Sequence, residues 1–217
     1  MKKLMIALAV FFVVLLGAIV VLPYLFKDEI ITAVKTAANE NLNAKLDFKD
    51  VNFSVFRHFP KLSVGLEGLD VSGAGPFNEV KLLRCERMDV AIDLLSAISG
   101  GKVIIKGIYL DRPDLNVYVL GDGRANYDIV KPTEEKPKTS QTESAPVRLE
   151  HYAISDGKMR YDDRSLNMLV EMEGLQHEGS GDLYADLYDL VMKTKVENLS
   201  VNYEGIQYLS KARADWG

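Results

Sequence analysis

The sequence is poor in the residues on which most catalytic and metal sites depend. It has one cysteine, Cys85, and three histidines, His58, His151 and His177. A single cysteine excludes an intramolecular disulfide, so an exported domain has to fold without covalent cross-links. The histidines fall in unrelated positions, and HExxH, GxSxG, P-loop and paired Cys/His spacings are all missing. The sequence therefore predicts no catalytic residue, no metal ligand and no cofactor, and we do not expect an enzyme.

Basic residues are too few to balance the acidic ones in the main part of the chain. Only Lys2 and Lys3 precede an uncharged segment at residues 4–26, whereas all 31 Asp and Glu follow it. Of the 26 Lys and Arg, 24 remain against these 31, so the body after residue 26 carries a net charge of −7. A negatively charged body argues against nucleic acid as a partner.

The uncharged segment at residues 4–26 is either a cleaved signal peptide or a permanent anchor. Its apolar run from Leu4 to Leu22 spans 19 residues, more than the roughly 7–15 of a signal peptide. As a helix the run is roughly 28 Å long, close to the hydrocarbon core of a bilayer. Bulky residues follow it where a cleavage site needs small ones. We predict a transmembrane signal-anchor at residues 1–26, with these side chains in the bilayer: Leu4, Phe11, Phe12, Leu15, Leu16 and Leu22.

The charges beside the anchor predict its orientation. Lys2 and Lys3 lie before it, whereas Lys27 after it is offset by Asp28 and Glu29. By the positive-inside rule, the N-terminus stays in the cytoplasm and the body lies outside. We therefore expect a single-pass membrane protein with an exported body.

The body begins with a helical pattern and continues with a strand pattern. At residues 28–42 apolar residues recur at intervals of three and four, which predicts a short amphipathic helix, either packed on the following sheet or lying at the membrane exit. From Leu46 onward apolar and polar residues alternate, which predicts half-buried antiparallel strands. Slips in the alternation at residues 49–50 and 67–68 predict β-bulges. Further strands are predicted at residues 80–93, 103–110, 114–120, 147–154, 158–163, 166–177, 183–196, 198–203 and 206–214, and one short helix at residues 94–99.

Three polar stretches predict breaks between strands. Residues 111–114, which include Pro113, are typical of a turn, and the Asp-Gly pair at 156–157 is a hairpin signal. Residues 131–146 hold three of the seven prolines and almost nothing apolar, which is typical of an exposed loop or linker. This linker divides the body into units at residues 27–130 and 147–217.

A strand-rich body with one persistent apolar face has to cover that face. A closed sandwich or barrel, or a helix laid on the sheet, would do so with protein. An open, curved sheet would leave the face to lipid acyl chains. Alternation alone is compatible with all of these arrangements.

Several short motifs, in this order, resemble the N-terminal region of the AsmA family. They are FPKLS at 59–63, LEGLDV at 66–71, GKVII at 101–105, LDRP at 110–113, GRANY at 123–127 and ISDGKMRYDD at 154–163. The segments at 175–182 and 196–209 are similar to Bacteroidetes-type members, and the resemblance covers nearly the whole chain. The family is related to TamB and to bridge-like lipid-transfer proteins built from repeating β-groove units.

The resemblance implies a periplasmic body anchored in the inner membrane. It implies a curved, antiparallel, trough-like β-groove, which we expect to be incomplete because family members are usually several hundred residues longer. The implied function is a lipid-binding or lipid-transfer module in phospholipid transport and outer-membrane biogenesis, with the inner membrane and phospholipid acyl chains as partners. The alternative is a membrane-tethered scaffold that assists outer-membrane protein assembly and targeting without carrying lipid, with assembly components as partners. The residues expected to line the groove are Leu46, Phe48, Val51, Phe53, Val55, Leu62, Val64 and Leu66.

Overall fold

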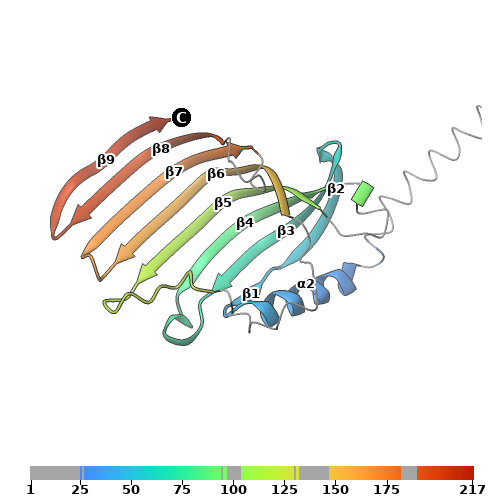
Figure 1. Ribbon diagram of the computed structural model, residues 1–217, viewed down its shortest axis with the longest axis horizontal. Coiled ribbons are helices and arrows are strands. Elements are labelled where there is room, and N and C mark those ends of the chain that lie inside the picture. Colours follow the sequence, from blue (N-terminus) through green and yellow to red (C-terminus); the bar gives the residue numbers. More distant parts are fainter. Residues whose placement is uncertain are drawn as a thin grey trace, which may run out of the picture.

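The computed structural model of the protein describes residues 25, 27–93, 95–96, 104–129, 131, 147–181 and 190–217. These residues form one open, curved sheet of nine strands with a helix beside it (Figure 1). The prediction of a mainly β fold is thereby confirmed. The six expected anchor side chains and residues 132–146 of the expected linker lie outside the described residues. No helix among the described residues is both long and apolar enough to cross a membrane.

Along the described part of the chain a helix comes first and nine strands follow it, with one 3-10 turn between the third and fourth strands. They are α2 (Lys27–Asn41), β1 (Lys45–Asp47), β2 (Asp50–His58), β3 (Lys61–Ser72), the 3-10 turn η1 (Gly75–Phe77), β4 (Lys81–Ile92), β5 (Ile105–Val119), β6 (Val147–Asp163), β7 (Met168–Ser180), β8 (Val191–Tyr203) and β9 (Ile206–Trp216). Across the sheet the order is β1-β3-β4-β5-β6-β7-β8-β9, and β2 pairs with β3 as well. β1 pairs with the end of β3 and β2 pairs with its beginning. The two short strands therefore lie one after the other along the same side of β3 and form the edge of the sheet. The helix predicted at residues 28–42 is confirmed as α2, and Asp28 and Glu29 in its first turn oppose the positive end of its dipole.

The prediction of a wholly antiparallel groove is wrong at one place, because β5 and β6 pair in parallel. The alternation of apolar and polar residues reports which face is exposed and carries no information on strand direction, so the sequence pattern could not reveal this. Parallel neighbours need a crossover connection. Its described part runs back to α2, where the backbone N–H of Asn43 donates to the carbonyl of Ile129 and that of Lys131 donates to the carbonyl of Asn41. One sheet thus runs through both units that the sequence predicts.

The two predicted turns at residues 111–114 and 156–157 are also wrong, because both lie inside continuous strands. β5 runs through Pro113, which pairs with Cys85 of β4, and β6 runs through Gly157, which pairs with Leu175 of β7. The residues before them do have the left-handed backbone of a turn, with φ of 49° at Arg112 and 52° at Asp156. Neighbouring strands pair with both halves of β5 and β6, so the left-handed residue interrupts the alternation of its strand and the chain does not reverse.

These left-handed residues lie at one level across the sheet. Gly68 of β3 and Gly174 of β7 have φ of 61° and 63°, and the predicted slip at residues 67–68 falls at Gly68. The predicted bulge is not seen there, because β3 and β4 keep one register on both sides of Gly68. The pairs on either side place Gly68 next to Glu86, Glu86 next to Arg112, and Arg112 next to Asp156. Gly174 lies between Leu175 and Glu173, the partners of Gly157 and Lys158. We call this line of residues, together with Gly174, the bulge row. Because the left-handed residues in it bend their strands at the same level, the row curves the sheet as a whole.

Replacing Gly174 in the bulge row by alanine should destabilise the fold. An alanine there takes a left-handed conformation that costs about 1–2 kcal/mol, and its Cβ would lie 2.6 Å from Cγ of Glu197. The control is Gly121→Ala, where φ is outside the left-handed region and no heavy atom lies within 4 Å of the new Cβ. Urea unfolding of the full chain, followed by circular dichroism, measures both. Equal free energies of unfolding for the two variants would contradict the role given to the row.

Candidate functional site

The strand pairing gives the sheet one apolar face. Directly paired residues project to the same side of a sheet. One row of pairs crosses the sheet through Phe53, Val64, Val90, Ile108 and Tyr152. A second row passes through Leu83, Leu115, Met159, Met172, Leu199 and Ala212. We call the side that carries these rows the apolar face.

The opposite side, the polar face, is lined by charges of alternating sign. One row of pairs runs through Asp70, Arg84, Asp114, Lys158, Glu173 and Asn198. Arg84 Nη2 donates to Asp114 Oδ2 over 2.8 Å, and Arg160 Nη1 to Glu171 Oε1 over 2.8 Å. Opposite charges facing each other across strands stabilise the pairing modestly and keep this side hydrated.

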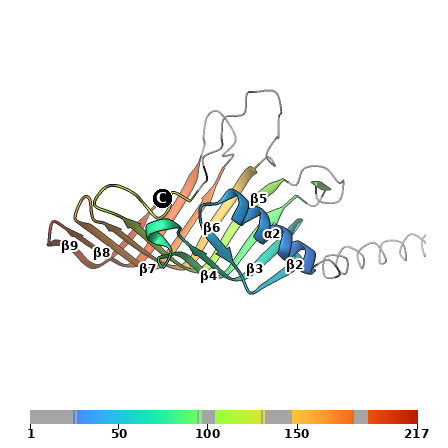
Figure 2. The ribbon, with the colours of Figure 1, turned by 90° about the horizontal axis from the view of Figure 1, so that it is seen from below.

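Helix α2 covers the apolar face over the first strands. Ile31 and Val34 of α2 pack against a cluster that includes Phe48, Val51 and Leu66. Val51 is completely buried there. Figure 2 shows α2 lying along one side of the sheet. Here the chain covers its own apolar surface with a helix, one of the two arrangements that the amphipathic pattern predicted.

The structure places the eight predicted groove residues in or beside this covered region. Leu46, Val51, Phe53, Leu62, Val64 and Leu66 lie on the apolar face through their pairs in β3 and β4. Phe48, between β1 and β2, is buried in the cluster under α2, and Val55 is half-buried in the irregular end of β2. Their contact with lipid stays a prediction.

Beyond β5 the apolar face continues with more exposed side chains, none of which was in the predicted set. Tyr161, Val170 and Val201 form a row in which every member is half-buried. At the far strand β9 the exposed fractions rise to 58% for Ile206 and 40% for Leu209. The alternation of apolar residues in these strands was a usable signal, but only the pairing shows that they extend the same face.

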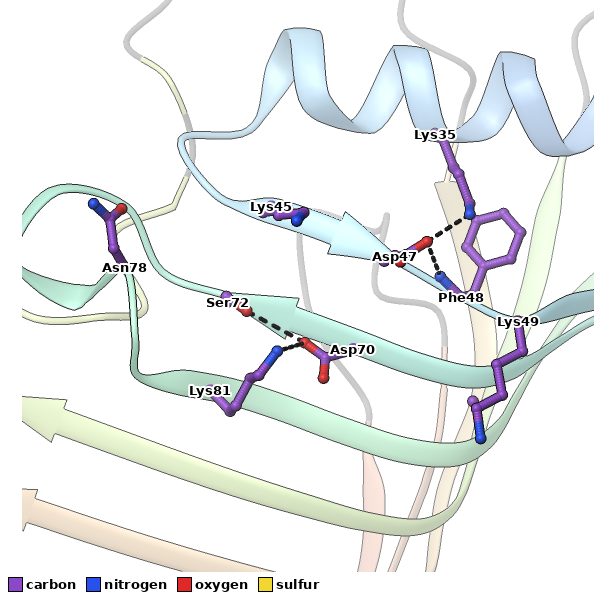
Figure 3. A pocket seen from close by; sticks show the side chains of 10 residues that line it. Lys35, Lys45, Asp47, Phe48, Lys49, Asp70, Ser72, Asn78 and Lys81 are labelled. Atoms are coloured by element: carbon purple, nitrogen blue, oxygen red, sulfur yellow. Dashed lines mark hydrogen bonds and ion pairs between the residues drawn. The ribbon is translucent and has the colours of Figure 1, made fainter.

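A cavity of about 540 Å³ beside β1 is lined mainly by charged residues (Figure 3). Lys35 of α2 donates to Asp47 over 2.5 Å, and Lys81 donates to Asp70 over 2.6 Å. The hydrogen bond from Lys35 is the main reason that the pKa of Asp47 lies below its ordinary value. Lys35 also lies 4.7 Å from the ring centre of Phe48. The two contacts of Lys35 attach α2 to the sheet beside β1.

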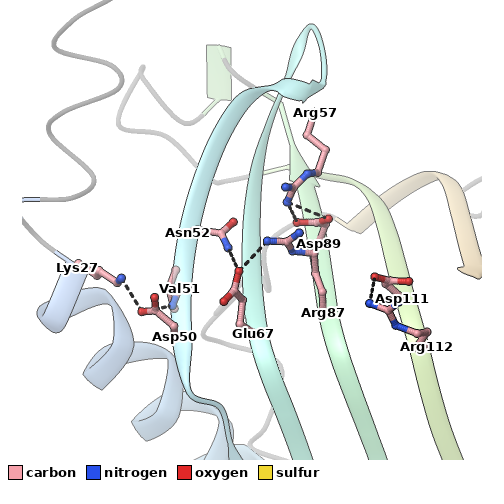
Figure 4. A network of polar contacts seen from close by, with 10 residues as sticks. All are labelled: Lys27, Asp50, Val51, Asn52, Arg57, Glu67, Arg87, Asp89, Asp111 and Arg112. Atoms are coloured by element: carbon pink, nitrogen blue, oxygen red, sulfur yellow. Dashed lines mark hydrogen bonds and ion pairs between the residues drawn. The ribbon is translucent and has the colours of Figure 1, made fainter.

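Polar contacts join α2 to β2, and separately join β2 to β3 and β4 (Figure 4). Lys27 pairs with Asp50 over 2.5 Å. Glu67 Oε1 accepts from Asn52 Nδ2 and from Arg87 Nη2, each over 2.7 Å. Because these bonds cross three neighbouring strands, they fix the edge of the sheet on which α2 rests.

The structure brings two of the three histidines together and separates the third. The His58 ring stacks on Tyr109 with centroids 3.8 Å apart, and Tyr109 also stacks on His151 at 5.4 Å. His177 lies on the apolar face, where its Nδ1 is 2.8 Å from the Thr194 hydroxyl. The first two therefore belong to an aromatic stack on the polar face.

Cys85 is packed inside the sheet. Its thiol donates to the carbonyl oxygens of Arg87 and Asp111, over 2.8 and 3.2 Å. Burial raises the pKa of the Cys85 thiol above its ordinary value. A neutral, buried thiol is a poor nucleophile, so this residue acts as a small core side chain.

Stability should fall as the pH decreases from 7 to about 5.5 because of His58. Burial lowers the pKa of His58 below its ordinary value of 6.5, with Asp89 partly opposing the shift. As the pH falls below the pKa of the unfolded state, the unfolded chain binds a proton at His58 that the folded chain does not bind. Proton binding therefore favours the unfolded state, and the free energy of unfolding decreases. His58→Phe keeps a ring on Tyr109 but cannot titrate, so its urea midpoint should depend less on pH over this range. An unchanged pH dependence in this variant would contradict the assignment, since His151 and His177 are present in both proteins.

Comparison with known proteins gives one match. The model of the AsmA family matches residues 1–215. No curated protein and no solved structure matches the chain. The match spans the uncharged N-terminal segment, α2 and the sheet up to Asp215 in β9, so it includes the apolar face described above. The chain belongs to the AsmA family.

Proposed function

We propose that the chain is an inner-membrane-anchored periplasmic module that binds lipid acyl chains on its apolar face and contributes to phospholipid transfer and outer-membrane biogenesis. Membership of the AsmA family is consistent with a role in the envelope related to lipid transport. The observation that carries the proposal is the continuation of the apolar face over β6 to β9, beyond the cluster under α2.

An exposed apolar face of this kind needs an apolar partner. The described members of the cluster under α2 extend only as far as Leu110 and Leu115 of β5. Farther along, Tyr203, Ile206 and Leu209 are between 38% and 58% exposed. Soluble proteins seldom leave contiguous apolar surface in water unless it has a function. An acyl chain lying along these rows would gain about 0.8 kcal/mol for each methylene group removed from water.

The shape of the surface suits a chain-like ligand better than a compact one. The apolar rows run across five neighbouring strands from β5 to β9, and the sheet stays open along them. Adjacent strands lie about 4.8 Å apart, so four steps from β5 to β9 cover roughly 19 Å. An extended acyl chain has this length scale, whereas the polar face on the other side stays in water.

The proposed location depends on the sequence that precedes α2. The uncharged run at residues 4–26 ends immediately before Lys27, the first residue of α2. Two lysines precede that run, and Asp28 and Glu29 follow it. This distribution supports an N-terminus in the cytoplasm and a sheet in the periplasm.

Photocrosslinking tests whether lipid contacts the apolar face. A benzophenone amino acid replacing Val201 in β8, in the full chain and in its native membrane, should form a phospholipid adduct detectable by mass spectrometry. The matched control is the same amino acid at Ser200, which pairs with Glu171 on the polar face and should form none. A protein adduct at position 201, with no lipid adduct, would contradict the proposal and favour the scaffold function.

A charge on the apolar face should abolish this adduct. Met172→Glu adds a carboxylate beside Met159 and Leu199, and desolvation of that charge should lower the lipid adduct at position 201 at least about tenfold. Gln176→Glu adds the same charge to the same strand on the polar face, opposite Lys195, and should leave the adduct unchanged. Circular dichroism shows whether both variants keep their strands. Equal lipid adducts in the two folded variants would contradict binding on the apolar face.

A further inference from the structure

Two phenylalanine side chains project into solvent at the turn between β2 and β3. Phe56 is 82% exposed and Phe59 is 77% exposed. Phe56 lies near the end of β2 and Phe59 in the turn that reverses the chain into β3, where His58 pairs with Lys61. We call residues 56–60 the tip. Neither ring belongs to the hydrophobic cluster under α2 among the described residues.

Polar contacts hold the tip in this conformation. The Ser54 hydroxyl accepts hydrogen bonds from the backbone N–H groups of Phe56, over 3.3 Å, and Arg57, over 3.2 Å. The Arg57 guanidinium pairs with Asp89 of β4 over 3.0 Å, and the Asp89 side chain is only 8% exposed. Figure 4 shows Arg57 pointing from the tip toward Asp89. The exposed rings are therefore carried by an anchored turn.

Basic residues surround the base of the tip. Arg57, Lys61 and Lys106 lie there in ion pairs, Arg57 with Asp89 and both lysines with Glu150. Exposed aromatic rings beside ion-paired basic residues are typical of protein surfaces that contact the interface of a bilayer.

A bilayer is within reach of the tip. The ion pair between Lys27 and Asp50 fixes the first turn of α2 against the start of β2, and the uncharged run ends one residue before Lys27. From Asp50 to Phe56, β2 advances roughly 20 Å. In Figure 1 the tip and the first turn of α2 both lie toward the right of the view.

We infer that Phe56 and Phe59 insert into the interfacial region of the lipid bilayer in which the chain is anchored. This inference rests on the membrane location in the proposed function. The tip and the anchor then form two separate attachments to one membrane. Two attachments fix the angle between the sheet and the bilayer, which a single helix does not.

Depth-dependent quenching of tryptophan tests the insertion. The full chain contains one tryptophan, Trp216, so Trp216→Phe provides a silent background. In it, Phe56→Trp, Phe59→Trp and Leu166→Trp are made one at a time. Leu166 is 51% exposed in the turn between β6 and β7, at the opposite end of the strands. Each protein is reconstituted into vesicles of phosphatidylethanolamine and phosphatidylglycerol, with and without dibrominated phosphatidylcholine, and isolated by flotation.

Brominated lipid should lower the emission of the Phe56→Trp and Phe59→Trp proteins at least about twofold and leave the Leu166→Trp protein unchanged. Floated protein without quenching at the tip overturns the inference and leaves the proposed function standing. Equal quenching at all three positions also overturns it, because the contact would then not be specific to the tip. Protein that does not float overturns both the inference and the proposed membrane location. Circular dichroism verifies that each variant is folded.

Discussion

The two-sided character of the sheet depends on the alignment of its bulges. A bulge shifts the alternation of a strand by one residue, so an isolated one would send all later apolar side chains to the opposite face. In β3 the apolar positions are even-numbered up to Leu66 and odd-numbered from Leu69, on the other side of Gly68. In β7 they likewise change from even at Met172 to odd at Leu175, on the other side of Gly174. Because neighbouring strands shift at the same level, most pairs on this side still join apolar to apolar, with His177 and Thr194 as an exception. One face thus stays mainly apolar across the sheet.

The same alignment connects the fold to the proposed lipid binding. The bulge row bends β3, β5, β6 and β7 at one level, and the sheet stays open, with an apolar face on one side and paired charges on the other. The helix covers the apolar face only over the first strands, around Val51 and Leu66. The second half of the face has no such cover among the described residues, and this difference between two halves of one surface supports lipid binding there.

The sequence pattern predicted α2 and most strand positions because periodicity reports burial directly, but it divided β5, β6 and β8, each of which is continuous. It located the slip at Gly68 because a slip in alternation is visible within one strand. The bulge at Asp156 was interpreted as a hairpin because a left-handed Asp-Gly pair serves both structures equally well, and only the pairing partners distinguish them. The candidate site was predicted only in part, because alternation reports the local pattern of a strand and not its neighbours. Alternation identified apolar residues such as Phe53 and Val64, but the position of α2 over the first strands depends on tertiary packing that alternation does not encode.

The parallel pairing of β5 and β6 has a consequence for the order of folding. Strands β2 to β5 pair with sequence neighbours, and the cluster under α2 is built from α2 and these strands. β6 reaches β5 only after the long connection between Val119 and Val147 has closed. A chain that folds from its N-terminus can therefore form the contacts among α2 and β2 to β5 before β6 is added. The finished edge of β5 then serves as the template on which β6, and each later strand in turn, is added.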